Sequence, residues 1–489
     1  MSHDGESEKD HTNLMSCLDG ALEAASELYG TQHMKYARLL HEKGNLHGAK
    51  KEHSLAIEAY VETLRIYKGE HGDSHLSVAN TLFNLGVSLN AKGSPDKAIR
   101  CFTKALRITK VKLGDDHLDV ADTYEQVAES NKLLLRYEDA KLYYEKALHV
   151  RKQTAGSSDL KSAAIMHELG KMHSQEESWD EAIKAFTESM NIRTMQLGQD
   201  DHLVATSMYN LGLVYKSRGD CTKATKYLEG SLRITKSNLA SGNPELANNF
   251  YSLGGVHGSL GNVGKSVFCY DKAVSLYSEL YGRQSQNVAL SLAGKGETLY
   301  SNEQFQEALS CFSECLDIRK LIDGSIPAKE SGDVFSYMGE TYSQLRDGTN
   351  ASLSFASALT TYRQIFGTKH QIVADVLLKM AVHFVKVGEL ERGYSCTKET
   401  LALQQELLGE NATKTADSHH LQGKILYKWE KYAAASVSFK RALRTHKEKL
   451  GEGHLSVANS NYYLGCISGK FFGSSQFNSK IFANVTLHF

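Results

Sequence analysis

The chain has 489 residues, a length that would correspond to about three compact domains. Only 3 residues are proline, whereas average usage near 5% would give about two dozen, so long uninterrupted helices are expected. Lysine and arginine (56) balance aspartate and glutamate (57), and this balance excludes a protein that binds nucleic acid or anionic membranes through net positive charge.

The amino terminus is polar and acidic, unlike a signal peptide, and no stretch of the chain approaches 18 consecutive apolar residues. We therefore expect a cytoplasmic protein without membrane insertion. Residues 1–11 are expected to be disordered. Residues 12–29 align with the second helix of a repeat, with Ala21 in the phase of Ala105, so we expect an N-terminal capping helix over residues 12–32.

From residue 33 to residue 468 the sequence repeats every 42 residues, with one inserted residue before Gly339. The first marker of the repeat is always small: Gly44, Gly86, Ala128, Gly170, Gly212, Gly254, Gly296, Gly339, Ala381, Gly423 and Gly465. A second small residue follows 12 positions later, from Ala56 to Ala435. Small residues at this spacing let two antiparallel helices approach closely, so each repeat is predicted to be a helical hairpin.

A large residue stands four positions after the second small one, and Thr397 is the exception. The large residues are Tyr60, Phe102, Tyr144, Phe186, Leu228, Tyr270, Phe312, Phe355 and Phe439. Three positions later the residue is small again, as at Ala105. We expect the ring to fill space between packed helices.

The segments between hairpins are also alike, as in residues 113–121 and 450–458. A glycine ends one helix, and the following Asp or Ser can cap the next helix. The linker position also repeats histidine, at His33, His75, His117, His370 and His454, and we expect these side chains to make local hydrogen bonds.

These offsets of small and aromatic residues resemble the tetratricopeptide repeat. The 42-residue period and the linker resemble the variant in kinesin light chains and nephrocystin-like proteins. The resemblance implies an all-α fold, a right-handed superhelical α-solenoid of about eleven helical-hairpin repeats over residues 33–468. The eleventh repeat lacks its second helix, and residues 469–489 are expected to be an irregular tail.

No cofactor, metal site or catalytic group is expected. The Gly-Lys-Ser at 264–266 lacks the rest of a phosphate loop, and His167 and His173 are six residues apart, too far for the two ligands of a helical zinc motif. Cys101, Cys269, Cys311 and Cys396 share one repeat position, which favours packing over redox chemistry.

The inner face of the first helix of each hairpin is the candidate binding surface, because tetratricopeptide repeats line their concave groove with residues six, three and two positions before the first small residue. We expect peptide contact at Asn80, Asn84, Asp122, Gln126, Asn210 and Asn248, in repeats 2 to 6. An amide can donate to a peptide carbonyl and accept from a peptide N–H at once. Repeats 3 and 4 also carry carboxylates at Glu125, Glu129 and Glu168, which disfavours a clamp for a terminal carboxylate and favours a neutral-to-basic segment.

The sequence thus predicts a non-enzymatic protein–protein interaction scaffold that binds extended peptide segments. A narrower hypothesis is a cargo or cytoskeletal adaptor resembling kinesin light chain, with microtubule-motor or cargo proteins as partners. The alternative is a regulatory repeat partner of a signalling NTPase that acts in trans.

Overall fold

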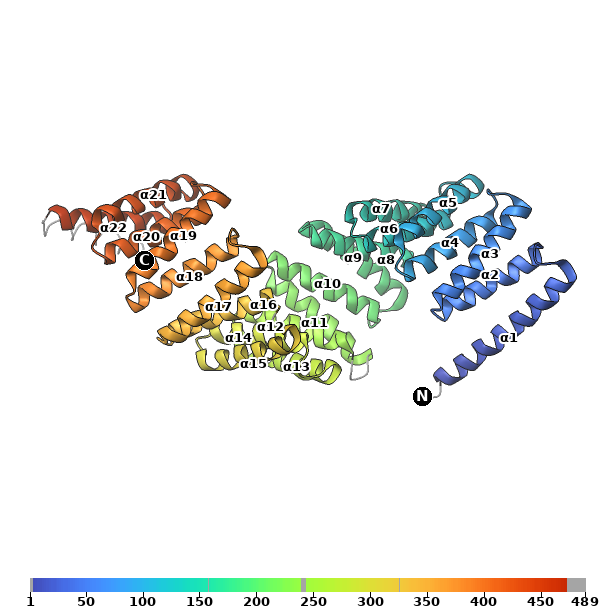
Figure 1. Cartoon of the computed structure of the whole chain (residues 1–489), viewed down its shortest axis with the longest axis horizontal. Coiled ribbons are helices and arrows are strands. Elements are labelled where there is room, and N and C mark those ends of the chain that lie inside the picture. The colour runs from blue at the N-terminus through green and yellow to red at the C-terminus, as the bar shows by residue number, and fades with distance from the viewer. Residues whose placement is uncertain (1–2, 157, 239–242, 325, 473–489) are drawn as a thin grey trace. The chain divides into compact units, whose positions relative to one another are not determined.

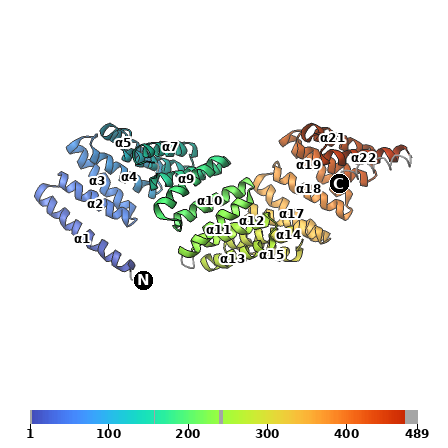
Figure 2. The same ribbon diagram turned by 180° about the vertical axis from the view of Figure 1, so that it is seen from behind.

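The computed structural model describes residues 3–156, 158–238, 243–324 and 326–472, and within these ranges it contains 22 α-helices and no β-strand. The chain divides into two compact parts, Met1–Asn238 and Leu239–Phe489, called here the N-terminal and C-terminal parts. Within each part the helices follow one another as stacked antiparallel hairpins (Figures 1 and 2). This all-α arrangement of hairpins confirms the predicted fold class.

The helices of the N-terminal part are α1 (His3–Tyr29), α2 (Met34–Ala49), α3 (His53–His71), α4 (Leu76–Ala91), α5 (Pro95–Leu113), α6 (Leu118–Leu133), α7 (Tyr137–Thr154), α8 (Leu160–Gln175), α9 (Trp179–Leu197), α10 (His202–Arg218) and α11 (Cys221–Asn238). Repeat 1 is the hairpin of α2 and α3, repeat 2 that of α4 and α5, and so on along the chain.

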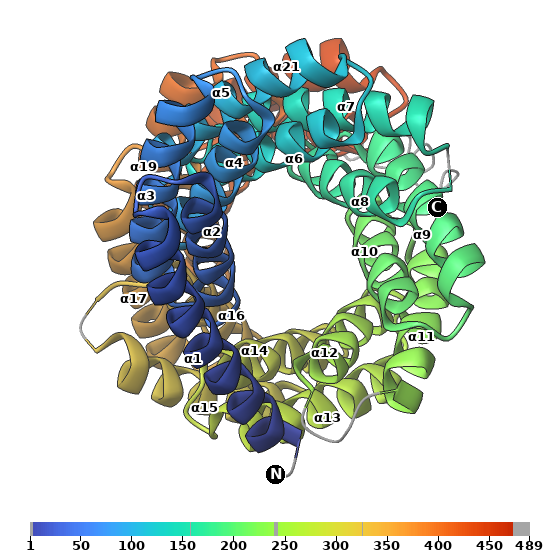
Figure 3. The same ribbon diagram turned by 90° about the vertical axis from the view of Figure 1, so that its right-hand side faces the viewer.

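The helices of the C-terminal part are α12 (Pro244–Ser259), α13 (Val263–Tyr281), α14 (Gln286–Ser301), α15 (Phe305–Asp323), α16 (Lys329–Gln344), α17 (Gly348–Phe366), α18 (Gln371–Val387), α19 (Leu390–Leu408), α20 (Thr413–Lys428), α21 (Tyr432–Leu450) and α22 (Leu455–Phe472). In each part taken by itself, the even-numbered helices lie on the inner side and the odd-numbered helices on the outer side (Figure 3). We call them inner and outer helices.

The two helices of a hairpin touch where a glycine of the inner helix faces the large residue of the outer helix. A Cβ added to Gly86 would lie 2.6 Å from the ring of Phe102, and one added to Gly296 would lie 2.6 Å from the ring of Phe312. Both rings are fully buried. The small residue therefore makes room for the ring inside its own hairpin.

Histidine side chains cap five of the inner helices. His75 Nδ1 accepts a hydrogen bond from the backbone N–H of Ser77 at 3.2 Å, and its ring stacks on His71 with centroids 4.2 Å apart. The same cap forms at four other linkers, at His33, His117, His370 and His454. The local hydrogen bonding predicted for these histidines is confirmed. Asp159, Asp201 and Asn243 cap α8, α10 and α12 instead.

The ends of the array are helical over a longer stretch than the sequence suggests. The first helix, α1, begins at His3, whereas the sequence predicts a helix from residue 12. The last helix, α22, extends to Phe472, four residues into the segment expected to be an irregular tail. Residues 473–489 of that tail lie outside the described residues.

We predict that Phe102→Ala destabilises the array by about 3–5 kcal/mol, because it leaves a cavity over Gly86. Phe102→Leu is the matched control and should cost clearly less, since repeat 5 places Leu228 against Gly212 at the same position. Denaturant unfolding followed by circular dichroism measures both losses. Equal losses for the two variants would contradict the packing role of the ring.

The histidine cap gives a second prediction. His75→Ala should cost about 1 kcal/mol of stability, since the Ser77 N–H loses its acceptor at the start of α4. His75→Asn restores a short side-chain acceptor and should recover most of the loss. The same unfolding measurement tests this, and a loss that Asn does not recover would indicate that ring stacking on His71 matters more than the cap.

Candidate functional site

A cavity of about 300 Å³ opens between the inner helices α4 and α6 of the N-terminal part. Its lining comes from four helices: His41, Ala79, Asn80, Phe83, Asn84, Ala105, Thr109, Asp119, Asp122 and Thr123. Ala79, Ala105 and Thr109 are buried, so the cavity reaches past the inner helices to the outer helix α5. Three of the six residues predicted to contact peptide, Asn80, Asn84 and Asp122, line it.

Asn84 is held by the repeat before it. Its amide nitrogen donates to Asn45 Oδ1 at 3.0 Å and lies 3.2 Å from His41 Nε2, so both amide hydrogens have partners. Asn45 Oδ1 also accepts from the Tyr60 hydroxyl at 2.7 Å, which fixes it as an acceptor. Asn84 can therefore offer a peptide its carbonyl oxygen, while its N–H groups hold repeats 1 and 2 together.

Asn210 repeats this arrangement in α10. Its amide nitrogen donates to the Thr206 carbonyl at 2.9 Å and lies 3.3 Å from His167 Nε2 of repeat 4. His167 occupies the position of His41, three residues before the first small residue. Burial, together with the positive charge of Arg193, lowers the pKa of His167 to about 4, so the ring is neutral at neutral pH, and Arg193 Nη1 lies 3.5 Å from its Nδ1.

Asn248 lies on α12 in the C-terminal part, where its Oδ1 accepts from the Tyr277 hydroxyl at 2.6 Å. The structure thus brings Asn80, Asn84, Asp122 and Gln126 together on two adjacent helices, α4 and α6, and places Asn210 further along the N-terminal part.

Asn80 and Gln126 differ from the other amides. The Asn80 side chain is exposed at the cavity, and neither amide has a hydrogen-bond partner among the described residues. Their donors and acceptors are both available to a ligand, which is the property that peptide recognition requires.

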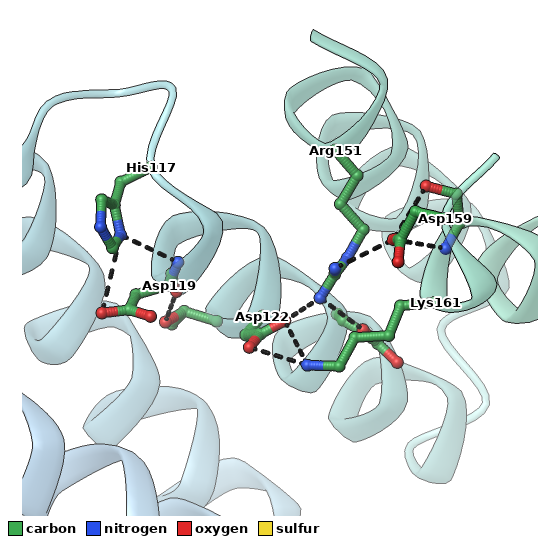
Figure 4. A network of polar contacts seen from close by, with 9 residues as sticks. His117, Asp119, Asp122, Arg151, Asp159 and Lys161 are labelled. Atoms are coloured by element: carbon green, nitrogen blue, oxygen red, sulfur yellow. Dashed lines mark hydrogen bonds and ion pairs between the residues drawn. The ribbon is translucent and has the colours of Figure 1, made fainter. Parts of the chain in front are cut away.

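The carboxylates of repeat 3 belong to a network centred on Arg151 (Figure 4). Arg151 comes from the outer helix α7, and its side chain is 3% exposed. Its guanidinium donates to Asp122, and to Asp159 Oδ2 at 3.2 Å. Lys161 Nζ reaches Asp122 from the next repeat at 3.1 Å. Asp122 therefore lies at the cavity, and Arg151 and Lys161 compensate its negative charge on the side that faces repeat 4.

Glu129 and Glu168 form a second set of ion pairs on the inner helices. Lys132 Nζ lies 2.7 Å from Glu129 and 3.0 Å from Glu168, and Lys171 also pairs with Glu168. Burial by itself would raise the pKa of Glu168, but the hydrogen bonds from Lys171 and Lys132 lower it overall. The acidic surface expected from the sequence is thus largely neutralised here.

Glu125 is the exception. Its one ion pair among the described residues is with Arg151, at 3.8 Å, beyond hydrogen-bond distance. Burial raises the pKa of Glu125, and the charges of Glu129, Asp159 and Glu168 raise it further against the opposing effect of Lys161. A cation brought close to Glu125 would favour its ionised form.

The sequence offered little sign of the residues that shape this site. Arg151, Lys161 and Thr109 lie outside the positions expected to face the groove, and Thr109 and Arg151 come from outer helices. Thr109 and Arg151 stand at the same outer-helix position of successive repeats. This position holds a long polar residue in most repeats and threonine in the others, and that variation is the one sign of the site in the sequence.

The other chemical motifs serve packing. Ser266 is buried and its hydroxyl donates to the Gly254 carbonyl at 2.7 Å. Cys269, Cys311 and Cys315 are buried free thiols, and burial raises the pKa of Cys315 to about 11. The part of the chain that the structure describes contains no group of three or more metal-ligating side chains and no helix apolar and long enough to cross a membrane.

We predict that Glu125→Gln stabilises the protein at neutral pH. A raised pKa means that ionising Glu125 costs more in the folded chain than in the unfolded chain, where the usual value is 4.5. This loss of folding stability is fully present when the pH is above the pKa of Glu125 in the folded chain. It vanishes as the pH falls below the pKa of Glu125 in the unfolded chain. Unfolding measured at neutral pH and at about pH 4 should show a gain for the variant only at neutral pH. A gain of equal size at both values would contradict the electrostatic origin.

Residues 77–153, 161–237 and 245–320 match the family model of the tetratricopeptide repeat. The clustered mitochondria protein homolog of Homo sapiens is 24% identical over 222 residues, which span 44% of this chain and only 16% of that relative.

Two solved structures to which the chain is similar are BtubC (BKLC) from P. vanneervenii and a putative kinesin light chain with nearly identical TPR-like repeats from Podosopora anserina. The first is 23% identical, with a TM-score of 0.41, over 46% of this chain and 89% of that chain. The second is 16% identical, with a TM-score of 0.38, over 42% of this chain and 97% of that chain. Each segment matched by the family model contains two hairpins, so the matched segments are tetratricopeptide repeats, and hairpins of the same design lie on both sides of the matched region.

Proposed function

We propose that this chain is a non-enzymatic scaffold of the cytoplasm that binds extended segments of partner proteins along the inner helices of its N-terminal part. The observation that carries the proposal is the cavity between α4 and α6, which is lined by Asp122 and by the amide of Asn80, unpartnered among the described residues. The amide of Gln126 lies on the same helix as Asp122 and is likewise without a partner in the described ranges.

The charges favour a neutral or basic segment. Asp119 and Asp122 line the cavity, and the cations nearest to them in the network, Arg151 and Lys161, lie on the repeat 3 and repeat 4 side of Asp122. A peptide carboxylate placed in the cavity would meet carboxylates, whereas a peptide amide or cation would meet acceptors. A free acidic carboxyl terminus is therefore a poor ligand for this surface.

We extend the proposal to the narrower role of a cargo or cytoskeletal adaptor, because the 42-residue period and the linker resemble those of kinesin light chains. Affinity capture of the full chain followed by arrays of overlapping segments from each captured protein identifies the partner and the segment. A captured cargo or cytoskeletal protein supports the narrower role, and partners of other classes restrict the proposal to the scaffold.

Replacing Asn80 and Gln126 together by Ala should lower the binding affinity for a mapped segment about tenfold or more, since two amide hydrogen bonds contribute on the order of 1 kcal/mol each. We choose these two side chains because Asn84→Ala would also remove the contacts of Asn84 with His41 and Asn45 in the preceding repeat. Isothermal titration calorimetry measures the affinity, and circular dichroism checks the fold.

The matched control is Thr103→Ala with Gln153→Ala, which removes two exposed polar side chains from the outer helices α5 and α7. This control should bind like the unmodified chain. If it abolishes binding while the Asn80 and Gln126 variant keeps its affinity, the outer helices carry the function.

A further inference from the structure

One buried position of the outer helices, 23 residues after the first small residue, decides how the space between neighbouring inner helices is filled. The side chains at this position are buried in all ten complete repeats. They are Tyr67, Thr109, Arg151, Arg193, Thr235, Tyr277, Arg319, Tyr362, Gln404 and His446. Eight are long and polar, and two are threonine.

In four repeats the long side chain reaches the inner helix of its own hairpin, at the residue six before the first small one. The Tyr277 hydroxyl donates to Asn248 Oδ1 at 2.6 Å, and the Tyr362 hydroxyl donates to Asp333 Oδ1 at 2.5 Å. His446 Nε2 lies 3.0 Å from Asp417 Oδ1. Arg151 reaches Asp122 in the same way. The outer helix thus supplies a polar side chain that fills the space between neighbouring inner helices. The same side chain gives the inner-helix residue a hydrogen-bond partner.

Repeat 2 lacks this side chain. Thr109 is too short to reach α4, and its hydroxyl donates to the Ala105 carbonyl of its own helix at 2.9 Å. The residue that a longer side chain would have contacted is Asn80, which has no partner among the described residues. The 300 Å³ cavity is lined by both Thr109 and Asn80. The cavity is therefore the space that Arg151, Tyr277 or His446 occupies in the other repeats.

Repeat 5 also carries a threonine, Thr235, but its surroundings differ. The residue six before the small one is Thr206, whose hydroxyl donates to the carbonyl of His202 in its own helix at 3.0 Å. The polar group opposite Thr235 is therefore already satisfied. Repeat 2 alone combines the short outer residue with an unsatisfied amide and a cavity, within the described part of the chain.

The rim of the repeat 2 cavity is negative. Repeat 4 places Lys161 at the position where repeat 3 places Asp119, and Lys161 pairs with Asp122. Among the described residues Asp119 makes one ion pair, with His117 at 3.6 Å, and its side chain is 56% exposed. The cavity thus has two carboxylates from α6 at its edge, a carbonyl oxygen from Asn80, and no lysine or arginine in its lining.

We propose that this cavity is an open socket for one arginine side chain of a bound peptide, an inference that rests on the proposed function. The guanidinium donates to Asp119 and to the Asn80 carbonyl oxygen, and the aliphatic part of the side chain lies against Phe83 and Ala79. The ligand arginine then takes the place that Arg151 takes from within the chain in repeat 3. Arginine suits the socket better than lysine because its fork of donors can meet two acceptors at once.

The test uses the full chain and immobilised libraries of short peptides with neutral degenerate flanks and one fixed central residue, which is Arg, Lys, Tyr, Glu or Ala. The Arg library should bind about tenfold more tightly than the Ala library. Lys should fall between them, and Glu should bind most weakly. Preference for Tyr or Glu over Arg would overturn the arginine socket.

Three variants locate the preference. Thr109→Arg supplies the missing side chain from within, as repeat 3 does, and should bring binding of the Arg library down to that of the Ala library. Thr103→Arg adds the same side chain to the exposed face of α5, outside the cavity lining, and should keep the Arg preference. Asp119→Lys copies repeat 4 at an exposed position and should abolish or reverse the preference without filling the cavity.

The outcomes separate this inference from the proposed function. An unchanged Arg preference in both Thr109→Arg and Asp119→Lys overturns the socket while peptide binding stands. Binding that depends on Asn80 and Gln126 but shows no preference for the central residue does the same. If no library and no captured segment binds the chain, the proposed function fails and the inference fails with it.

Discussion

The close approach of two helices over a glycine is the constraint on which the rest of this structure depends. A Cβ at Gly86 would lie 2.6 Å from the Phe102 ring, a distance that real Cβ atoms do not tolerate. The glycine lets the ring lie inside its own hairpin, so the hairpin becomes a rigid element with two exposed flanks. Those flanks must then be covered by the neighbouring hairpins, which is why the array is continuous within each part of the chain.

The space between neighbouring inner helices is where the repeats differ from one another. The glycine and the ring are nearly constant, but the buried position 23 residues after the glycine changes among Tyr, Arg, His, Gln and Thr. At Arg151, Tyr277, Tyr362 and His446 the long side chain closes the space between inner helices with a hydrogen bond to the inner helix. Thr109 leaves it open, so the cavity in repeat 2 results from a side chain that is too short for its place.

The histidines show how the array holds the amides of the candidate binding surface. His41 and His167 each lie beside an amide nitrogen of the next repeat, on Asn84 and Asn210 respectively. Burial lowers the pKa of both rings, and neutral rings can accept these hydrogen bonds. The amide of Asn84 is thereby fixed in orientation, with its N–H groups turned to the protein and its carbonyl oxygen directed away from them.

The sequence by itself determined the hairpins, their period and the inner helices on which Asn80, Asn84, Asp122 and Gln126 lie, because close packing demands small residues at fixed spacing and leaves a readable pattern. It also determined the linker histidines, since a cap is a contact within a few residues. The tertiary structure decided which amides are free. Asn84 and Asn210 are engaged by histidines 43 residues earlier, and Arg151 reaches Asp122 across 29 residues. Such partners depend on the length and direction of side chains within and between stacked hairpins, which periodicity does not encode, and the cavity at Thr109 exists only because those hairpins are packed together.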